Sequence, residues 1–223
     1  MSNSENSLQE DTSEESNRLT TKFNRLAQLS APGFQQIFSS LSEQPGNSSG
    51  STIGFVGCRR YVGASTVSIQ ASLVAACIHG MRTILVDANF RAPILAEKFE
   101  IESPIGLSNC LMDLEELDLA VKNAGIDNLD VLPIGNLKLK SRGNLGARFV
   151  ELTSRLTSEY DLVVVDLPEA GSQVIPILQK GMNQTYLVGN SRKMSSAKML
   201  QVKKRLIRRN VALDGLFLNQ YPA

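Results

Sequence analysis

A glycine-rich stretch has most of what a phosphate-binding loop needs. The letters GCRRYVGAST run from Gly57 to Thr66, directly after an apolar segment. In the loop pattern G-x-x-x-x-G-K-[ST], backbone N–H groups surround the phosphates, a lysine reaches the outer phosphates and a hydroxyl holds magnesium. Here Gly63 is followed by Ala64 and then by Ser65. The sequence therefore predicts a phosphate loop that lacks its lysine.

Two aspartates add a candidate metal site. Asp87 closes the apolar run ILVD, and Asp166 closes the run LVVVD. Carboxylates at strand ends, beside a loop that opens a helix, can hold Mg²⁺ or position a nucleophile. Either aspartate alone could equally be a helix cap or a turn residue. In combination with the glycine loop they favour a Mg²⁺-nucleotide site.

Short strands alternating with helices must position these residues. Apolar runs predict strands at 52–56, 83–86, 129–132, 162–165, 185–188 and 213–218. Helices are expected at 64–79, 113–124, 146–158, 172–182 and 194–209. Continuous Val, Ile and Leu runs indicate strands buried on both faces, and the alternation implies parallel crossovers. The predicted fold is a doubly wound, mostly parallel α/β sheet with helices on both faces, whose ligands lie at the carboxyl ends of the strands.

The N-terminal part has a different composition. Residues 1–22 are acidic and polar, which predicts a disordered tail. Apolar side chains at three- and four-residue intervals predict a helical preface at 23–44, broken at Pro32-Gly33. Residues 45–51 read as a linker, and the α/β domain is expected at 52–223.

Bulk composition narrows the class of protein. With 223 residues, 42% hydrophobic composition and a formal charge of +1, the chain fits one domain with a good core. Three cysteines without C-x-x-C spacing and a single histidine support neither a zinc site nor a disulfide framework. The start does not read as a secretory signal, and no run approaches the roughly 18 apolar residues of a membrane span. We expect a cytoplasmic protein, or one held at the inner face of the cell membrane by another component.

A basic segment lies between Arg192 and Arg209. It holds eight lysines and arginines and no acidic residue, while Met199, Val202 and Leu206 mark a buried helix face. One interpretation is a solvated polar face. The other is a surface for an acidic partner: the cytosolic end of a membrane protein, acidic lipid or DNA. The lack of interleaved aromatics makes DNA the weaker option.

From residue 34 to residue 219 the chain resembles the bacterial tyrosine autokinases of capsule and exopolysaccharide synthesis, within the MinD/ParA-like group of P-loop ATPases. The runs that carry the resemblance are IGFVGCRRYVGAST, ILVDANFRAP, GLSNCLMD, NLDVLPIG, YDLVVVDLPEA and GLFLN. The resemblance implies a P-loop NTPase-like fold with ATP and Mg²⁺ as cofactors. It also implies a transmembrane polysaccharide chain-length regulator, or another export component, as the partner.

The resemblance implies a role for each matching residue. The catalytic carboxylates would be Asp87 and Asp166, and with Ser65 they would hold Mg²⁺. Thr66 would contact the α-phosphate, and Asn219 the adenine. The residues implied to bind the cofactor are Gly57, Gly63, Ala64, Ser65, Thr66 and Asn219.

Several departures from the family pattern gather in the site. The family loop reads approximately G-E-G-K-S-T, so Tyr61, Val62 and Ala64 replace the glycine, the glutamate and the lysine, and Asn89 replaces a second aspartate. Losing one well-placed charge donor typically lowers the rate about 10²- to 10³-fold. Arg59 or Arg60 could replace the lysine, or could be exposed loop charges.

Other departures lie outside the loop. The positions that match a ring-forming motif, E-x-x-R-x-x-R, hold Pro32, Gln35 and Phe38, and a single tyrosine, Tyr221, stands where the family has a tyrosine-rich tail. We favour a degenerate, non-catalytic regulator of polysaccharide polymerisation or export, whose cofactors, if it has any, are ATP and Mg²⁺, since Ala64 in place of the phosphate lysine disfavours their binding. The alternative is an active tyrosine autokinase, or a ParA-like ATPase, with an atypical loop.

Overall fold

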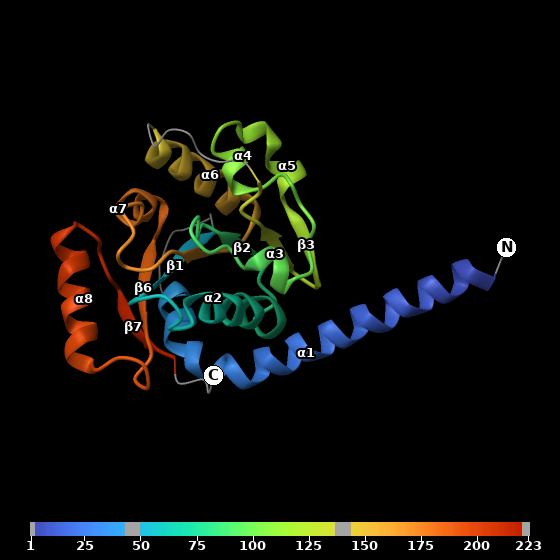
Figure 1. The fold of residues 1–223 in the computed structure, drawn as a ribbon, viewed down its shortest axis with the longest axis horizontal. Coiled ribbons are helices and arrows are strands. Elements are labelled where there is room, and N and C mark those ends of the chain that lie inside the picture. The colour runs from blue at the N-terminus through green and yellow to red at the C-terminus, as the bar shows by residue number, and fades with distance from the viewer. Residues whose placement is uncertain (1–2, 43–49, 137–143, 220–223) are drawn as a thin grey trace.

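The computed structural model describes residues 3–42, 50–136 and 144–219 (Figure 1). A seven-stranded sheet with the order β3-β4-β2-β5-β1-β6-β7 forms its centre. Only the edge strand β3 is antiparallel to its neighbour within the described part of the chain. The strands are β1 (Ser51–Gly57), β2 (Thr83–Asp87), β3 (Lys122–Ile126), β4 (Leu129–Leu132), β5 (Leu162–Leu167), β6 (Gln184–Gly189) and β7 (Gly215–Leu218). The predicted mostly parallel α/β sheet is confirmed.

Helices pack on both faces of this sheet. On one face, α1 (Asn3–Ser42) and α2 (Ala64–Leu73) share a buried cluster with β1. On the other face, α6 (Leu145–Glu159), α7 (Ile175–Leu178) and α8 (Ser196–Arg208) share a second buried cluster with β5. The remaining α-helices are the short segments α3 (Leu95–Lys98), α4 (Leu107–Cys110) and α5 (Leu117–Ala120). Because helices cover both faces of the sheet, its central strands are buried on both sides and must be apolar.

The predicted helix at 64–79 forms with a change of pitch. Its first ten residues are α-helical, and the five residues Val74–Ile78 continue it as a π-helix. Gly80 has φ of 64° and ends the helix in the left-handed region, as its position after the apolar stretch predicts. The two 3₁₀ turns are Leu114–Glu116 and Gln179–Gly181.

The predicted helix at 113–124 is wrong in its second half. The segment folds into a 3₁₀ turn and the short helix α5, and then enters β3. The burial of β3 alternates along the strand, and only Ile126 is fully buried. An edge strand is covered by fewer neighbours, and its sequence, KNAGI, has Ile126 as its one β-branched residue and lacks the Val, Ile and Leu runs of the central strands.

The N-terminal region also differs from the prediction. A single helix, α1, runs through the expected tail at 1–22 from Asn3 onward and continues past Pro32 to Ser42. Its first half projects away from the rest of the molecule (Figure 1). Helical hydrogen bonds are local, so the helix can extend beyond the part that packs. Around Pro32 the buried side chains of Phe34 and Phe38 outweigh the loss of one N–H donor. Most of the predicted linker at 45–51 lies outside the described residues.

Candidate functional site

The glycine loop leaves β1 in a shape that few residues can adopt. Tyr61 and Gly63 both have left-handed backbone angles, with φ of 61° and 89°. A side chain at Gly63 would collide with Nδ2 of Asn219, so glycine is required there on two counts. Asn219 Nδ2 donates to the carbonyl oxygen of Val62 at 3.0 Å. The residue after β7 therefore fixes the loop that follows β1.

The loop opens directly into α2. Gly63 is the residue before the helix, and no side chain caps that end. The first hydrogen bond back into the loop runs from the N–H of Val67 to the carbonyl oxygen of Gly63, at 3.0 Å. The N–H groups of the first turn thus have no helical partner, and such an end attracts phosphate. Backbone N–H groups at this end of α2 are thus available to a phosphate, and Ala64 brings no charge to them.

The two predicted carboxylates lie side by side on neighbouring strands. Asp87 and Asp166 are register partners on β2 and β5, and both side chains are fully buried. Ser68 Oγ donates to Asp166 Oδ1 at 3.3 Å, whereas Oδ2 of Asp166 has no hydrogen-bond partner among the described residues. Burial, and then the charge of Asp87, raise the pKa of Asp166 to about 8, and the hydroxyls of Ser65 and Ser68 oppose that rise.

The unpartnered oxygen of Asp166 fits a hydrated Mg²⁺. Mg²⁺ keeps several waters and is bound through one or two carboxylates together with substrate phosphates. Ser65 lies in the first turn of α2 next to Asp166, so a hydroxyl and a carboxylate are available at one place. Within the described ranges, no three His, Cys, Asp or Glu side chains gather to hold a metal. Phosphate oxygens would therefore have to complete the shell.

Asp87 has a different set of partners. Its Oδ1 accepts the N–H of Asn89 at 3.1 Å, and its Oδ2 accepts the N–H groups of Ile94 and Leu95 at 3.0 and 3.1 Å. Burial raises the pKa of Asp87 to about 6, and these three backbone hydrogen bonds work against that rise. Asp87 therefore orders the segment 88–95, which borders the loop. Its catalytic and metal-binding roles stay predictions.

All six predicted cofactor-binding residues line one cavity of about 380 Å³, a usual size for a small-molecule site. Gly57, Gly63, Ala64, Ser65, Thr66 and Asn219 are joined there by residues from other elements. Among these newcomers are Glu169 after β5 and Lys193 after β6. Sequence reasoning missed both as site residues, although each follows the carboxyl end of a predicted parallel strand, where ligands of such sheets bind.

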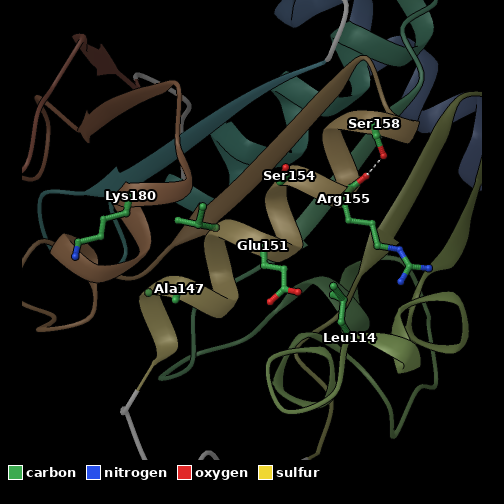
Figure 2. Close-up of a pocket in the computed structure, with 9 residues that line it drawn as sticks. Leu114, Ala147, Glu151, Ser154, Arg155, Ser158 and Lys180 are labelled. Atoms are coloured by element: carbon green, nitrogen blue, oxygen red, sulfur yellow. Dashed lines mark hydrogen bonds between the residues drawn. The ribbon is translucent and has the colours of Figure 1, made fainter.

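A second hollow runs along the outer side of α6 (Figure 2). Its lining is the helix face from Ala147 to Ser158, with Leu114 and Lys180 at its borders. Arg155 is paired with Asp118 at 3.5 Å, and Ser158 Oγ donates to the carbonyl oxygen of Arg155 at 2.6 Å. None of the predicted site residues lies here, so the loop cavity is the candidate site.

The basic segment divides into parts with different contacts. Arg209 donates to the carbonyl oxygens of Ala170 and Ser172 at 2.9 and 2.7 Å, and Lys193 reaches the glycine loop. Met199 and Leu206 are buried and Val202 is partly buried, as the spacing predicts. Of the eight cations only Arg209 is partly buried, and the exposed ones are Arg192, Lys193, Lys198, Lys203, Lys204, Arg205 and Arg208. Among these, Lys193 also contacts the glycine loop.

The fold and the loop define a P-loop NTPase-like α/β domain, and comparison with known proteins agrees. The VpsO kinase domain superposes with a TM-score of 0.75 at 21% identity, covering 91% of this chain and 97% of that one. The chimerical protein CapA2B2 gives 0.73 at 23%, covering 85% and 84%. MinD from Pyrococcus horikoshii, complexed with Mg-ADP, gives 0.59 at 22%, covering 77% and 70%.

By sequence the chain is related to bacterial tyrosine-protein kinases. It is 26% identical to tyrosine-protein kinase YwqD of Bacillus subtilis over 70% of this chain and 67% of that one. It is 23% identical to the putative tyrosine-protein kinase CapB of Staphylococcus aureus over 64% of each, and 29% identical to the putative tyrosine-protein kinase EpsB of Ralstonia solanacearum over 71% of this chain. The match spans slightly under two thirds of CapB and 21% of EpsB. No protein-family model matches the sequence.

Proposed function

We propose that this chain is a non-catalytic relative of the bacterial tyrosine kinases that regulates polysaccharide polymerisation or export. One observation carries the proposal: Ala64 opens α2 in a loop that otherwise keeps the backbone of a phosphate loop. The kinship with tyrosine-protein kinases supports this interpretation of the loop. A phosphate site that has kept its shape and lost its cation suits binding better than transfer.

The chemistry explains why the missing cation matters for catalysis. Phosphoryl transfer is accelerated almost entirely by positioning and by neutralising charge on the moving group. Bound Mg²⁺ would supply part of that neutralisation, held by Ser65 and Asp166. Arg59 and Arg60 are exposed, and the guanidinium of Arg60 lies 5.8 Å from the centre of the Tyr61 ring. Without a cation on the first turn of α2, we expect the rate of transfer to fall about 10²- to 10³-fold.

The regulatory role implies a membrane partner. We place the protein in the cytoplasm, recruited to the inner face of the cell membrane by a transmembrane chain-length regulator or another export component. The exposed cations of α8 would contact an acidic surface of that partner, since such patches attract opposite charge. Among the described residues, no helix is long and apolar enough to cross a membrane.

A second candidate is an ATPase of the ParA kind that uses the basic surface on DNA. It is favoured by the fold, because a ParA family ATPase from Chlorobium tepidum superposes with a TM-score of 0.57 at 15% identity. The exposed lysines and arginines of α8 would suit contact with a phosphate backbone, but the helix carries no aromatic residue for base stacking. This candidate requires ATP turnover, which the first does not.

Incubation of the folded protein with labelled ATP and Mg²⁺ tests the proposal. We expect no label on tyrosine, because the loop lacks its cation. Stoichiometric label on a tyrosine that an Asp87→Ala variant does not acquire would overturn it. Label that appears equally in that variant would point to a contaminating kinase, so the assay is read as the difference between the two proteins.

A further inference from the structure

Lys193 reaches the glycine loop from a distant part of the chain. Its Nζ donates to the carbonyl oxygen of Tyr61 at 3.0 Å, and its side chain lines the loop cavity. A lysine ammonium has three donors, and this contact uses one of them. Lys193 thus has two remaining donors and its positive charge at the edge of the cavity, which is also lined by Ala64 and the first turn of α2.

The turn that carries Lys193 is held by hydrogen bonds to Asn190. Asn190 is buried at the end of β6, where its Oδ1 accepts the N–H of Arg192 at 3.0 Å. Its carbonyl oxygen accepts the N–H groups of Lys193 and Met194 at 3.0 and 2.9 Å. β6 pairs in parallel with β1, so the turns after both strands emerge at the same edge of the sheet. The position of Lys193 over the loop is therefore a property of the fold.

Charge at the cavity is unbalanced toward positive. Glu169, the acidic residue of the lining, is already paired with Arg91 at 3.1 Å. Lys193, Arg59 and Arg60 have no carboxylate within ion-pair distance in the described part of the chain. Asp166 lies next to Ser65, and one of its buried oxygens has no hydrogen-bond partner among the described residues. An anion bound at the loop would neutralise the unpaired cations, and a divalent cation bound with it would give the oxygen of Asp166 a partner.

We propose that Lys193 provides the phosphate-binding charge that Ala64 lacks, so that the cavity binds a nucleoside diphosphate or triphosphate without transferring phosphate. This inference rests on the proposed function, because it takes Gly57–Thr66 as a phosphate loop. Lys193 stands at the rim, tied to Tyr61, whereas a lysine at position 64 would stand on the helix itself. The charge of Lys193 is sufficient for binding nucleotide. It lies away from the N-terminal end of α2, where a cation would be needed for phosphate transfer.

Calorimetric titration with ADP and Mg²⁺ tests the role of Lys193 in the full chain. We compare the natural protein with Lys193→Met, which keeps the length of the stem, and Lys193→Arg, which keeps the charge. Lys198→Met is the matched control, because it removes the same charge from an exposed site outside the cavity. Melting temperatures without ADP should be equal in all four proteins, since both lysines are exposed.

Removing a charged hydrogen bond should weaken binding roughly tenfold to a hundredfold in Lys193→Met. Lys193→Arg and Lys198→Met should stay within about threefold of the natural protein. Equal affinity of Lys193→Met and the natural protein, or an equal loss in Lys198→Met, would overturn the inference and leave the phosphate loop standing. Absence of any binding at millimolar ADP would also overturn it, and would leave the non-catalytic proposal intact. Tyrosine labelling by ATP would instead contradict the absence of transfer, which comes from the proposed function, and would leave the role of Lys193 in binding intact.

Discussion

At position 64 the proposed function rests on a single side chain, that of Ala64. The methyl group of Ala64 begins α2 beside Gly63, whose left-handed angle and contact with Asn219 preserve the shape of the loop. The N–H groups of the first turn are still available to phosphate. What changes is the charge, because Lys193, a cation that lines this cavity, comes from another turn and contacts the loop at Tyr61.

Ala64→Lys should tighten nucleotide binding without creating a kinase. Ligand that binds only the folded state stabilises it by RT ln(1 + [L]/Kd), about 2.7 kcal/mol at a hundredfold excess over Kd. At a fixed concentration of Mg-ATP, the melting temperature of the variant should therefore rise further than that of the natural protein. Tyrosine should stay unlabelled in both, since the substitution adds no acceptor.

The natural protein and Ala64→Lys could instead show the same change in melting temperature when Mg-ATP is added, and each such result has its own interpretation. Equal stabilisation of natural protein and variant would show that Ala64 is no obstacle to nucleotide, and phosphate release would then decide between the non-catalytic and the ATPase candidates. No response in either would indicate that Tyr61 and Val62 have closed the loop.

Asp166 makes stability depend on pH. Its folded pKa of about 8 lies above the value near 3.9 of an unfolded aspartate. Between these values the folded chain holds a proton that the unfolded chain releases, so stability is greatest at low pH and is lost as pH rises toward 8. Asp166→Asn should flatten this slope in metal-free buffer, by an amount on the order of a few kcal/mol across the range.

Urea unfolding at several pH values between 5 and 8.5 measures this slope. The test compares how the free energy of unfolding changes with pH in the two proteins. A constant difference between them carries no information, because a buried asparagine lowers stability by about 1–3 kcal/mol at every pH. An identical slope in Asp166→Asn and the natural protein would show that the carboxylate is ionised in the folded state.

Elements that pack on both sides could be predicted from their own residues. The strands β1, β2, β4, β5 and β6 carry runs of Val, Ile and Leu that fit burial on two faces. The strand β3 could not be predicted in this way, because it forms by pairing with β4 and its sequence, KNAGI, has no such run. The role of Lys193 was hidden for a related reason: the contact joins residues 132 positions apart, and only the pairing of β6 with β1 brings them together.

The helix α1 belongs to the core at its second half. Phe34 is 1% exposed and stacks on Phe217 at 4.9 Å. We expect Phe34→Ala to destabilise the fold by roughly 3–5 kcal/mol, the usual cost of removing a buried aromatic ring. Leu29→Ala on the same helix is the control, because Leu29 is 69% exposed and should change stability by less than about 0.5 kcal/mol. Chemical denaturation of the two variants decides; a small effect of Phe34→Ala would mean that α1 does not pack in solution.

At the scale of the whole molecule, fold class and site location could be predicted, while the balance of charge in the site could not. The loop, Asp87, Asp166 and Asn219 meet because parallel strands place their carboxyl ends at one edge. Whether each side chain is free or engaged depends on its neighbours. Asp87 accepts three backbone N–H groups, whereas one oxygen of Asp166 accepts none from the part of the chain that the structure describes.

Assembly is a second property of the whole molecule. The positions that resemble the ring-forming motif hold Pro32, Gln35 and Phe38, of which Phe38 is buried and the other two are exposed without charge. We therefore expect a monomer or a small oligomer. Light scattering on the isolated protein measures the mass. A ring-sized particle without any partner would show that another surface mediates assembly.

The central claim is that the cavity binds nucleotide and does not consume it, and phosphate release at saturating Mg-ATP tests that claim most directly. Occupancy is first fixed by titration, so that a lack of turnover cannot be due to an empty site. We predict release no faster than in a matched Asp87→Ala preparation, with no label retained on protein. Turnover or tyrosine label that the natural protein shows and that preparation lacks would contradict the account.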